Sequence, residues 1–310
     1  MTKIILEKLD DPESIPQDQL EEVWGDPWQH ARLLADLERT RGLVDFLARH
    51  APGKRVVEVG CGTGLLSCIA ARMGASSVVG IEPTRRYVDA QRLVEASGLS
   101  DTVTILHGRV EDFEPGQADL VFSELLNADP FAEGVVPAMR AGAAWLAPGG
   151  LLAPGELELH VALVAAADVD AEATGAAEIV TELGRTWNLN VRPLLETLEA
   201  TPARTTSASW VELRSAPVLA LRVPLGVPER HVESVELDLF ASQKGRVCGA
   251  VLWFSARYDA ELVLANPPQE PGHWGLLVTC WPRAMSLEEG ERVRVRVDLR
   301  EIPGVAVVPV

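Results

Sequence analysis

Two glutamates, Glu124 and Glu133, stand nine residues apart in the segment SELLNADPFAEG, directly after a short apolar run. A guanidinium group is planar, permanently charged and rich in hydrogen-bond donors, so its binding favours more than one carboxylate acceptor. Two acids in a loop are in most proteins solvated surface groups. The place of this pair, after a predicted strand at the ligand-binding edge of an α/β sheet, favours a site for a planar cation instead.

A second candidate site is the loop VVEVGCGTG, residues 56–64, which joins an apolar strand pattern to a helical one. Small residues in such a turn let the backbone approach a ligand closely. The third position of the dinucleotide pattern G-x-G-x-x-G is not glycine, so a dinucleotide site is not well supported. Glu82 ends the next predicted strand, where its carboxylate can accept hydrogen bonds from both hydroxyls of a ribose. The alternative for Glu82 is a solvated acid at a strand end.

The elements that position these residues change character along the chain. From about residue 31 to 148, short Val/Ile-rich runs alternate with helical patterns, which predicts a doubly wound α/β domain with a parallel sheet. Beyond Gly155, apolar residues alternate strictly with polar ones, which predicts antiparallel strands. Residues 175–200 interrupt that half with a helical stretch that we interpret as a protruding arm. The expected strands cover 55–59, 77–82, 103–107 and 119–123, and the expected helices cover 32–48, 65–73 and 84–97.

Composition narrows the class of partner. The chain has 310 residues, 47% of them hydrophobic, and a formal net charge of −17 at pH 7. Such a charge repels phosphate and anionic lipid and attracts cations, so we expect neither nucleic acid nor membrane as partner. Four widely separated cysteines indicate reduced thiols and no metal framework. The acidic N-terminal segment does not resemble a signal peptide, and we expect a cytoplasmic protein.

Several motifs together resemble those of class I S-adenosylmethionine methyltransferases, and more narrowly those of the protein arginine methyltransferase family in a bacterial-type form. Ser123, Glu124 and Glu133 match the paired-glutamate pattern S-E-x(8)-E of that family. The other matching segments are the loop of residues 56–64, GIE at Gly80–Glu82, GRVED at Gly108–Asp112, Gly272-His273-Trp274 in place of a Thr-His-Trp loop, and His30, Asp36, Arg39 and Thr40 at the offsets of H-x(5)-D-x-x-R-T.

The resemblance implies S-adenosylmethionine as cofactor, S-adenosylhomocysteine as its product, and no metal. It makes Glu124 and Glu133 the substrate clamp, with Trp274 beside the substrate. It also implies that Asp36 orients His273, and that this pair or a glutamate accepts the released proton. Arg39 would pair with the methionine carboxylate and Glu111 with the adenine amino group, although either could be a solvated charge. The implied cofactor-binding residues are His30, Arg39, Gly60, Gly62, Gly64, Glu82, Val110 and Glu111.

The same resemblance divides the chain into three parts. Residues 1–50 would form N-terminal helices that close over the cofactor, and residues 51–154 a Rossmann-like cofactor domain. Residues 155–310 would form an antiparallel β-barrel-like substrate domain that carries the helical arm at about 175–200. By family analogy the arm would join two copies of the chain in a homodimer.

The chain also departs from the family pattern. The two-tyrosine motif before the first helix is missing, and Leu125–Ala128 replace the usual Trp-Met-Gly-Tyr of the glutamate loop. These changes, with a chain close to a bare catalytic core, favour methylation of the guanidino group of free L-arginine or a small arginine-derived metabolite. Three alternatives stay open: arginine residues of a polypeptide, another nitrogen or oxygen nucleophile of a substrate whose amine the glutamates hold, and an inactive binding or assembly protein with this fold.

Overall fold

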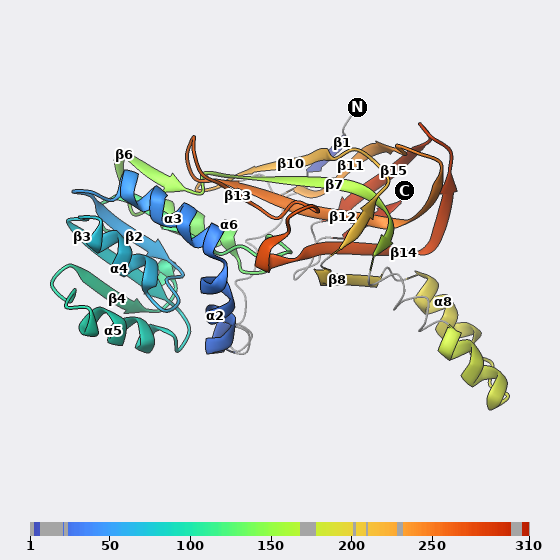
Figure 1. Ribbon diagram of the computed structural model, residues 1–310, viewed down its shortest axis with the longest axis horizontal. Coiled ribbons are helices and arrows are strands. Elements are labelled where there is room, and N and C mark those ends of the chain that lie inside the picture. Colours follow the sequence, from blue (N-terminus) through green and yellow to red (C-terminus); the bar gives the residue numbers. More distant parts are fainter. Residues whose placement is uncertain are drawn as a thin grey trace.

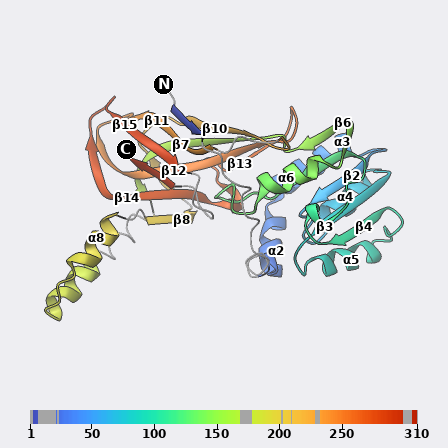
Figure 2. The ribbon, with the colours of Figure 1, turned by 180° about the vertical axis from the view of Figure 1, so that it is seen from behind.

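The computed structural model describes residues 3–6, 21, 24–167, 178–200, 203–208, 210–227, 232–298 and 306–309. A parallel sheet with its helices forms one end of the molecule, and antiparallel strands form the other (Figure 1). The view from behind shows the same division (Figure 2). No helix in these ranges is long and apolar enough to cross a membrane.

The predicted parallel sheet is confirmed. Its strands run in the order β4-β3-β2-β5-β6, and every neighbouring pair is parallel. The fifth strand, β6, was not expected, because its sequence LAPGGLLA carries proline and glycine in the middle and its pairing with β5 shifts register there. The strands are β2 (Arg55–Val59), β3 (Ser77–Glu82), β4 (Val103–His107), β5 (Ala118–Ser123) and β6 (Leu146–Ala153).

The helices of this half are α4 (Leu65–Arg72), α5 (Tyr87–Ala96) and α6 (Val135–Ala143). The prediction that a helix begins at Thr84 is wrong. The Thr84 hydroxyl donates to Glu82 Oε1 at 2.6 Å, and its backbone N–H donates to the same oxygen at 2.9 Å. This turn delays the start of α5 and keeps the Glu82 carboxylate at the end of β3.

The single helix predicted over 32–48 is two helices, α2 (Pro27–Ala35) and α3 (Leu37–His50). Asp36 separates them with φ −74° and ψ 89°, and its Oδ1 accepts the backbone N–H of Arg39 at 3.0 Å. An aspartate at this position satisfies a backbone donor that has no partner in the first turn of a helix. The helical spacing of apolar residues continues across Asp36, so the sequence pattern gives no sign that a new helix begins there.

The second half is antiparallel, as the alternating pattern predicts. Val293, Val295 and Val297 of β15 are buried, whereas the arginines between them are not. A seven-stranded sheet has the order β10-β7-β12-β14-β8, with β9 and β13 paired to β7 and β12, and a four-stranded sheet has the order β1-β11-β15-β16. Both sheets contribute side chains to one hydrophobic core. Closure of these strands into a barrel stays a prediction.

The strands of the antiparallel half come from both ends of the sequence. They are β1 (Lys3–Leu6), β7 (Glu156–Ala167), β8 (Ala203–Ala208), β9 (Val211–Leu213), β10 (Val218–Pro224), β11 (Val232–Phe240), β12 (Gly245–Arg257), β13 (Val263–Ala265), β14 (Leu276–Leu287), β15 (Arg292–Asp298) and β16 (Ala306–Pro309). Strand β1 pairs with β11, so residues 3–6 of the part predicted as N-terminal helices (1–50) form a strand instead. The parallel sheet ends with β6 and the antiparallel one begins with β7. The domain limits themselves stay predictions.

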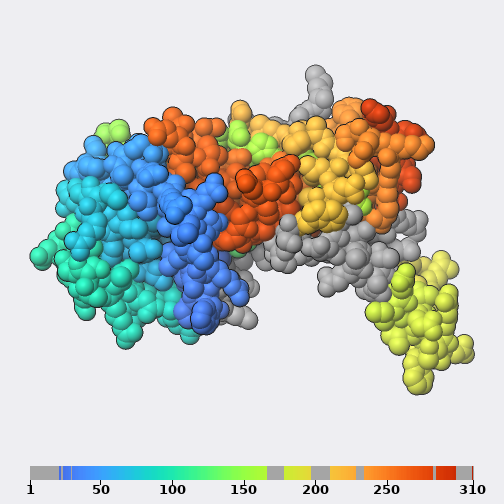
Figure 3. Space-filling view, viewed as in Figure 1, coloured from blue at the N-terminus to red at the C-terminus, as the bar shows by residue number. Residues whose placement is uncertain are grey.

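A helical arm leaves the antiparallel half and stands apart from the rest of the molecule (Figures 1 and 3). It contains a helix over 178–186 and α8 (Arg192–Ala200). Ile179, Leu183 and Trp187 follow one another at helical spacing and are 63%, 49% and 69% exposed. Leu189 and Leu194 are also exposed. An apolar stripe of this kind is more typical of an interaction surface than of solvated surface.

Candidate active site

One pocket opens at the carboxyl end of the parallel sheet, with about 1260 Å³ of empty space including its open mouth. Its walls come from α2, α3, the glycine loop after β2, the end of β3, the short 3-10 helix Val110–Asp112 and the loop after β5. This is enough room for a ligand of cofactor size. The residues of the sequence predictions that line it are His30, Arg39, Gly60, Gly62, Glu82, Val110, Glu111, Glu124 and Glu133.

The glycine loop lies against the pocket because of its backbone geometry. Gly60 and Gly62 have φ of 73° and 54°, in the left-handed region that favours glycine. A Cβ on Gly62 would lie 2.8 Å from the His30 ring, so the loop and α2 approach each other closely. Gly64, predicted as cofactor-binding, is not among the described pocket-lining residues. It starts α4, and a Cβ there would lie 2.8 Å from that of Ala90.

Glu82 is buried and holds the loop from the end of β3. Its Oε2 accepts the Gly62 N–H at 2.7 Å, and its Oε1 accepts both donors of Thr84. A carboxylate has about four acceptor positions, and these bonds use three of them. The contact to both ribose hydroxyls predicted for Glu82 would therefore displace a protein donor, whereas contact to one would not.

Glu58 lies beneath the loop as a buried acid of β2. Burial, together with the neighbouring Glu82, raises its pKa to about 8, although the Ser67 hydroxyl donates a hydrogen bond to it. Glu58 is therefore mostly protonated at neutral pH. The countercharge of the nearby Arg39 has to come from another carboxylate.

That carboxylate is Glu124. Arg39, a buried residue of α3, donates from Nη2 to Glu124 Oε2 and from Nη1 to the Leu33 carbonyl at 3.4 Å. Burial disfavours the charge of Arg39, but Glu124 outweighs this effect and the pKa of Arg39 is raised. Arg39 Nε is buried and has no hydrogen-bond partner among the described residues. The predicted contact to a cofactor carboxylate stays a prediction, and this donor fits it.

The two glutamates of the loop share a pattern. Glu124 gives Oε2 to Arg39, and its Oε1 is buried without a hydrogen-bond partner in the described chain. Glu133 accepts at Oε1 from Asn127 Nδ2 at 3.2 Å, and its Oε2 makes no hydrogen bond to a described residue. Burial and the charge of Glu124 raise the pKa of Glu133 well above the usual value. Each carboxylate thus has one oxygen bound by the protein and one without a hydrogen-bond partner among the described residues.

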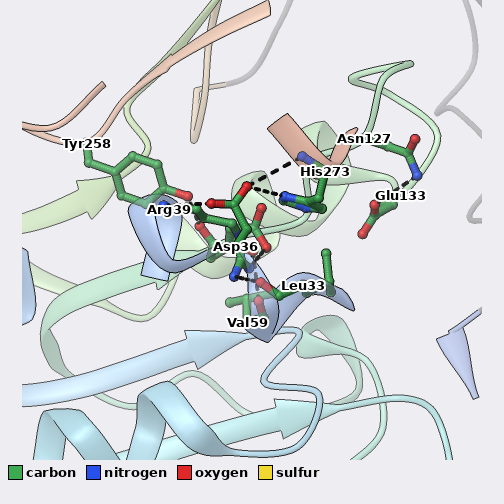
Figure 4. Close-up of polar contacts among 10 residues, drawn as sticks. Leu33, Asp36, Arg39, Val59, Asn127, Glu133, Tyr258 and His273 are labelled. Atoms are coloured by element: carbon green, nitrogen blue, oxygen red, sulfur yellow. Dashed lines mark hydrogen bonds and ion pairs between the residues drawn. The ribbon is translucent and has the colours of Figure 1, made fainter. Parts of the chain in front are cut away.

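Asp36 and His273 meet across the two halves of the chain, as expected (Figure 4). His273 Nδ1 lies 2.8 Å from Asp36 Oδ2, and the His273 backbone N–H donates to the same oxygen at 3.4 Å. Burial raises the pKa of Asp36, but these contacts and the Arg39 N–H outweigh it and lower the pKa. Because the carboxylate accepts, Nδ1 carries a proton, and in a neutral imidazole Nε2 is then the acceptor.

Trp274 is not among the described residues that line the pocket, and its place beside the substrate stays a prediction. It is buried, its ring packs edge-on against Phe254 with centroids 5.3 Å apart, and the His273 ring lies tilted against it with centroids 4.3 Å apart. Gly272 starts this turn with φ 61°, and a Cβ there would lie 3.3 Å from Asp36 Oδ2. The family's threonine is therefore replaced by the residue that suits this backbone best.

Two contributing residues were not predicted from the sequence. The Tyr258 hydroxyl, from the antiparallel half, donates to the Ser123 carbonyl at 2.7 Å, directly before Glu124. Nothing in the pattern around Tyr258 indicates this contact. Asn127 binds Glu133, and its only signal is that it replaces the glycine of the family's glutamate loop.

The protonation of Glu58 gives a stability test. The unfolded carboxyl ionises near its ordinary pKa of 4.5, whereas the folded one keeps its proton to about pH 8. The free energy of unfolding should therefore fall as pH rises through this window, by up to about 1.4 kcal/mol per pH unit, and level off above it. We expect Glu58→Gln to lack this component. Urea unfolding of both proteins measures it, and a constant difference between wild type and variant across the window would contradict the burial argument.

A family model described as a methyltransferase domain matches residues 56–150. Probable protein arginine N-methyltransferase 6 from Arabidopsis thaliana is 37% identical over 144 residues, which is 45% of this chain and 33% of that relative. This chain thus spans about a third of the length of that plant protein. Arginine N(omega)-methyltransferase from Streptomyces achromogenes subsp. streptozoticus is 27% identical over 282 residues, 87% of this chain and 76% of that relative.

Solved structures extend the likeness to both halves. The fold matches Arabidopsis thaliana protein arginine methyltransferase 10 with a TM-score of 0.76 at 20% identity, over 89% of this chain and 88% of that one. It matches the Trypanosoma brucei PRMT1 enzyme–prozyme heterotetrameric complex with AdoHcy with a TM-score of 0.74 at 21% identity, over the same shares. The glycine loop, Glu82 and Glu111 on one pocket suit an adenosine-bearing ligand. Residues 56–150 thus match a methyltransferase domain, and the chain has the fold of solved protein arginine methyltransferases.

Proposed function

We propose that this chain is an N-methyltransferase that transfers a methyl group to the guanidino group of arginine. One observation carries the proposal: Glu124 and Glu133 line the cofactor pocket, and each keeps one carboxylate oxygen without a described protein partner. Two such acceptors suit the forked donors of a guanidinium. The names of two relatives, an arginine N(omega)-methyltransferase and a protein arginine N-methyltransferase, support the same activity.

For methyl transfer, the protein mainly has to align the guanidino nitrogen with the methyl group and to balance the positive charge of the guanidinium. A guanidinium has a pKa above about 12 and is a poor nucleophile, because its lone pairs are delocalised. Glu124 Oε1 and Glu133 Oε2 would hold the outer nitrogens and concentrate the positive charge there, which leaves the attacked nitrogen richer in electrons. Bound S-adenosylmethionine supplies the methyl group from its sulfonium for an in-line displacement. Arg39 Nε would hold the cofactor's carboxylate.

The nitrogen that receives the methyl group loses a proton, and the pocket offers two kinds of acceptor. The first is one of the two loop glutamates, Glu124 or Glu133. The second is His273 Nε2, the ring nitrogen opposite the bond to Asp36. We favour the glutamates because they line the pocket, whereas His273 is not among its described lining residues.

Free arginine or a small guanidine metabolite is our first candidate substrate. The Streptomyces relative is named an arginine N(omega)-methyltransferase and matches 87% of this chain. Leu125–Ala128 also replace the bulkier residues of the family's glutamate loop. Arginine in a polypeptide is the second candidate, because protein arginine N-methyltransferase 1 of Schizosaccharomyces pombe matches 89% of this chain at 25% identity.

Mass spectrometry with S-adenosylmethionine tests the activity and separates the substrates. Free L-arginine, agmatine, an arginine-rich peptide and lysine are offered in separate reactions. We expect methylated free arginine or agmatine. Methylation of the peptide alone would establish the second candidate, and methylation of lysine would point to another amine nucleophile. If no guanidine is methylated, the proposed activity is wrong.

The clamp predicts the behaviour of Glu124→Gln and Glu133→Gln. Each should lower kcat/KM for the guanidine substrate about 100-fold or more, because a charge-assisted contact to a developing charge is worth about 2–4 kcal/mol. Glu133→Gln should bind S-adenosylhomocysteine as wild type does, measured by calorimetry. The exposed Glu95→Gln on α5 is the control and should keep wild-type turnover. Full turnover in both loop variants would eliminate the clamp.

We also propose that the arm binds a second copy of the chain. The support is its exposed stripe of Ile179, Leu183, Trp187, Leu189 and Leu194 on a segment that stands apart from the rest of the molecule. Wild type should sediment as a dimer and Trp187→Asp as a monomer, because a charge in a buried apolar contact is costly. A wild type that sediments as a monomer at micromolar concentration would refute this role, and Arg185→Ala on the same arm is the control for a general effect of substitution there.

A further inference from the structure

Asn127 is fastened at both ends of its amide. Its Oδ1 accepts the backbone N–H of Ala128 at 2.7 Å. Its Nδ2 donates to Glu133 Oε1 at 3.2 Å (Figure 4). A backbone N–H can only donate, so the atom that faces Ala128 has to be the amide oxygen. The NH₂ group therefore faces Glu133, and the network itself fixes this orientation.

The position of Asn127 separates it from the residues that touch a ligand. Glu124, Leu125, Glu133 and Gly134 line the pocket, whereas Asn127 is not among its described lining residues. It contacts Glu133 across the loop that both residues share. Any effect of Asn127 on a bound molecule has to pass through the Glu133 carboxylate or through the loop backbone that it also binds.

The two glutamates differ in what holds them. Glu124 is paired with the charged Arg39, and this ion pair keeps one of its oxygens in place. Glu133 has no cation of the described chain within ion-pair distance, and its hydrogen-bond partner is the neutral amide of Asn127. A buried carboxylate with neither cation nor donor would rotate freely or take up a proton. The Asn127 donor favours the charged form against burial and the Glu124 charge, which both disfavour it.

We propose that Asn127 is a positioning residue of the guanidine site, which holds Glu133 Oε1 so that Oε2 is presented to the substrate. This inference rests on the proposed function, since it assigns Glu133 to the guanidinium. It explains why an asparagine stands in a loop where the related family has a glycine. A glycine there has no side chain to hold the second glutamate.

Asn127→Asp is the decisive variant. An aspartate keeps an oxygen for the Ala128 N–H, so the loop contact remains, but it replaces the donor to Glu133 with an acceptor. The pKa of Glu133 should rise further, and the acidic limb of the kcat/KM profile, where Glu133 becomes ionised, should move to higher pH. We expect kcat/KM for the guanidine substrate to fall about 10-fold or more, as for a lost hydrogen bond to a charged group. Affinity for S-adenosylhomocysteine should stay at the wild-type value.

Asn127→Ala and a double variant separate positioning from loop damage. Asn127→Ala loses both contacts and should shift the acidic limb in the same direction. In a Glu133→Gln background, Asn127→Asp should weaken arginine binding far less than in wild type, because the two residues act through one contact. Calorimetric binding of arginine to the S-adenosylhomocysteine complex measures this coupling without turnover.

The outcomes keep the two claims distinct. A wild type that binds arginine but methylates no guanidine would sink the proposed activity, and the binding cycle would still decide the role of Asn127. An Asn127→Asp protein with a wild-type acidic limb and wild-type arginine affinity would overturn the positioning role. Parallel losses of arginine and S-adenosylhomocysteine affinity would also overturn it, because they would mark a general collapse of the loop.

Discussion

The ion pair between Arg39 and Glu124 is the interaction on which the pocket depends. Both groups are buried, and a buried charge without a partner is costly enough to rearrange its surroundings. Arg39 belongs to α3 and Glu124 to the loop after β5, so the pair fixes the N-terminal helices against the edge of the parallel sheet. Because Glu58 is mostly protonated at neutral pH, Glu124 is the carboxylate that balances Arg39.

The antiparallel half is joined to this pair at two points. Tyr258 donates to the Ser123 carbonyl, one residue before Glu124, and its ring packs edge-on against Phe46 of α3 with centroids 5.6 Å apart. His273 binds Asp36, three residues before Arg39. Each contact thus holds a residue that is close in sequence to one member of the Arg39–Glu124 pair. The antiparallel half therefore supports the pocket from behind, by holding the residues next to Arg39 and Glu124.

Much of this arrangement could be predicted from periodicity and from motif spacing. The four expected parallel strands and the antiparallel half are confirmed, because continuous apolar runs and strict alternation are local signals. The site residues at the ends of β2, β3 and β5 could be predicted because the apolar runs show where these strands end. The break at Asp36 was missed because an N-cap inside an amphipathic pattern leaves the period unchanged. Tyr258 and Asn127 were missed because their roles depend on contacts between side chain and loop, which no sequence period records.

Asp36 illustrates how two distant parts of a chain restrict one position. Its Oδ1 serves the first turn of α3, and its Oδ2 serves His273 of the other half. An asparagine there offers one acceptor oxygen, a serine one hydroxyl, and a glutamate too long a stem for the helix start. Each would keep one contact at the expense of the other. Position 36 therefore tolerates fewer residue types than its partly exposed position suggests. A change at residue 273 alone would not make more residue types acceptable there, because α3 would still require its N-cap.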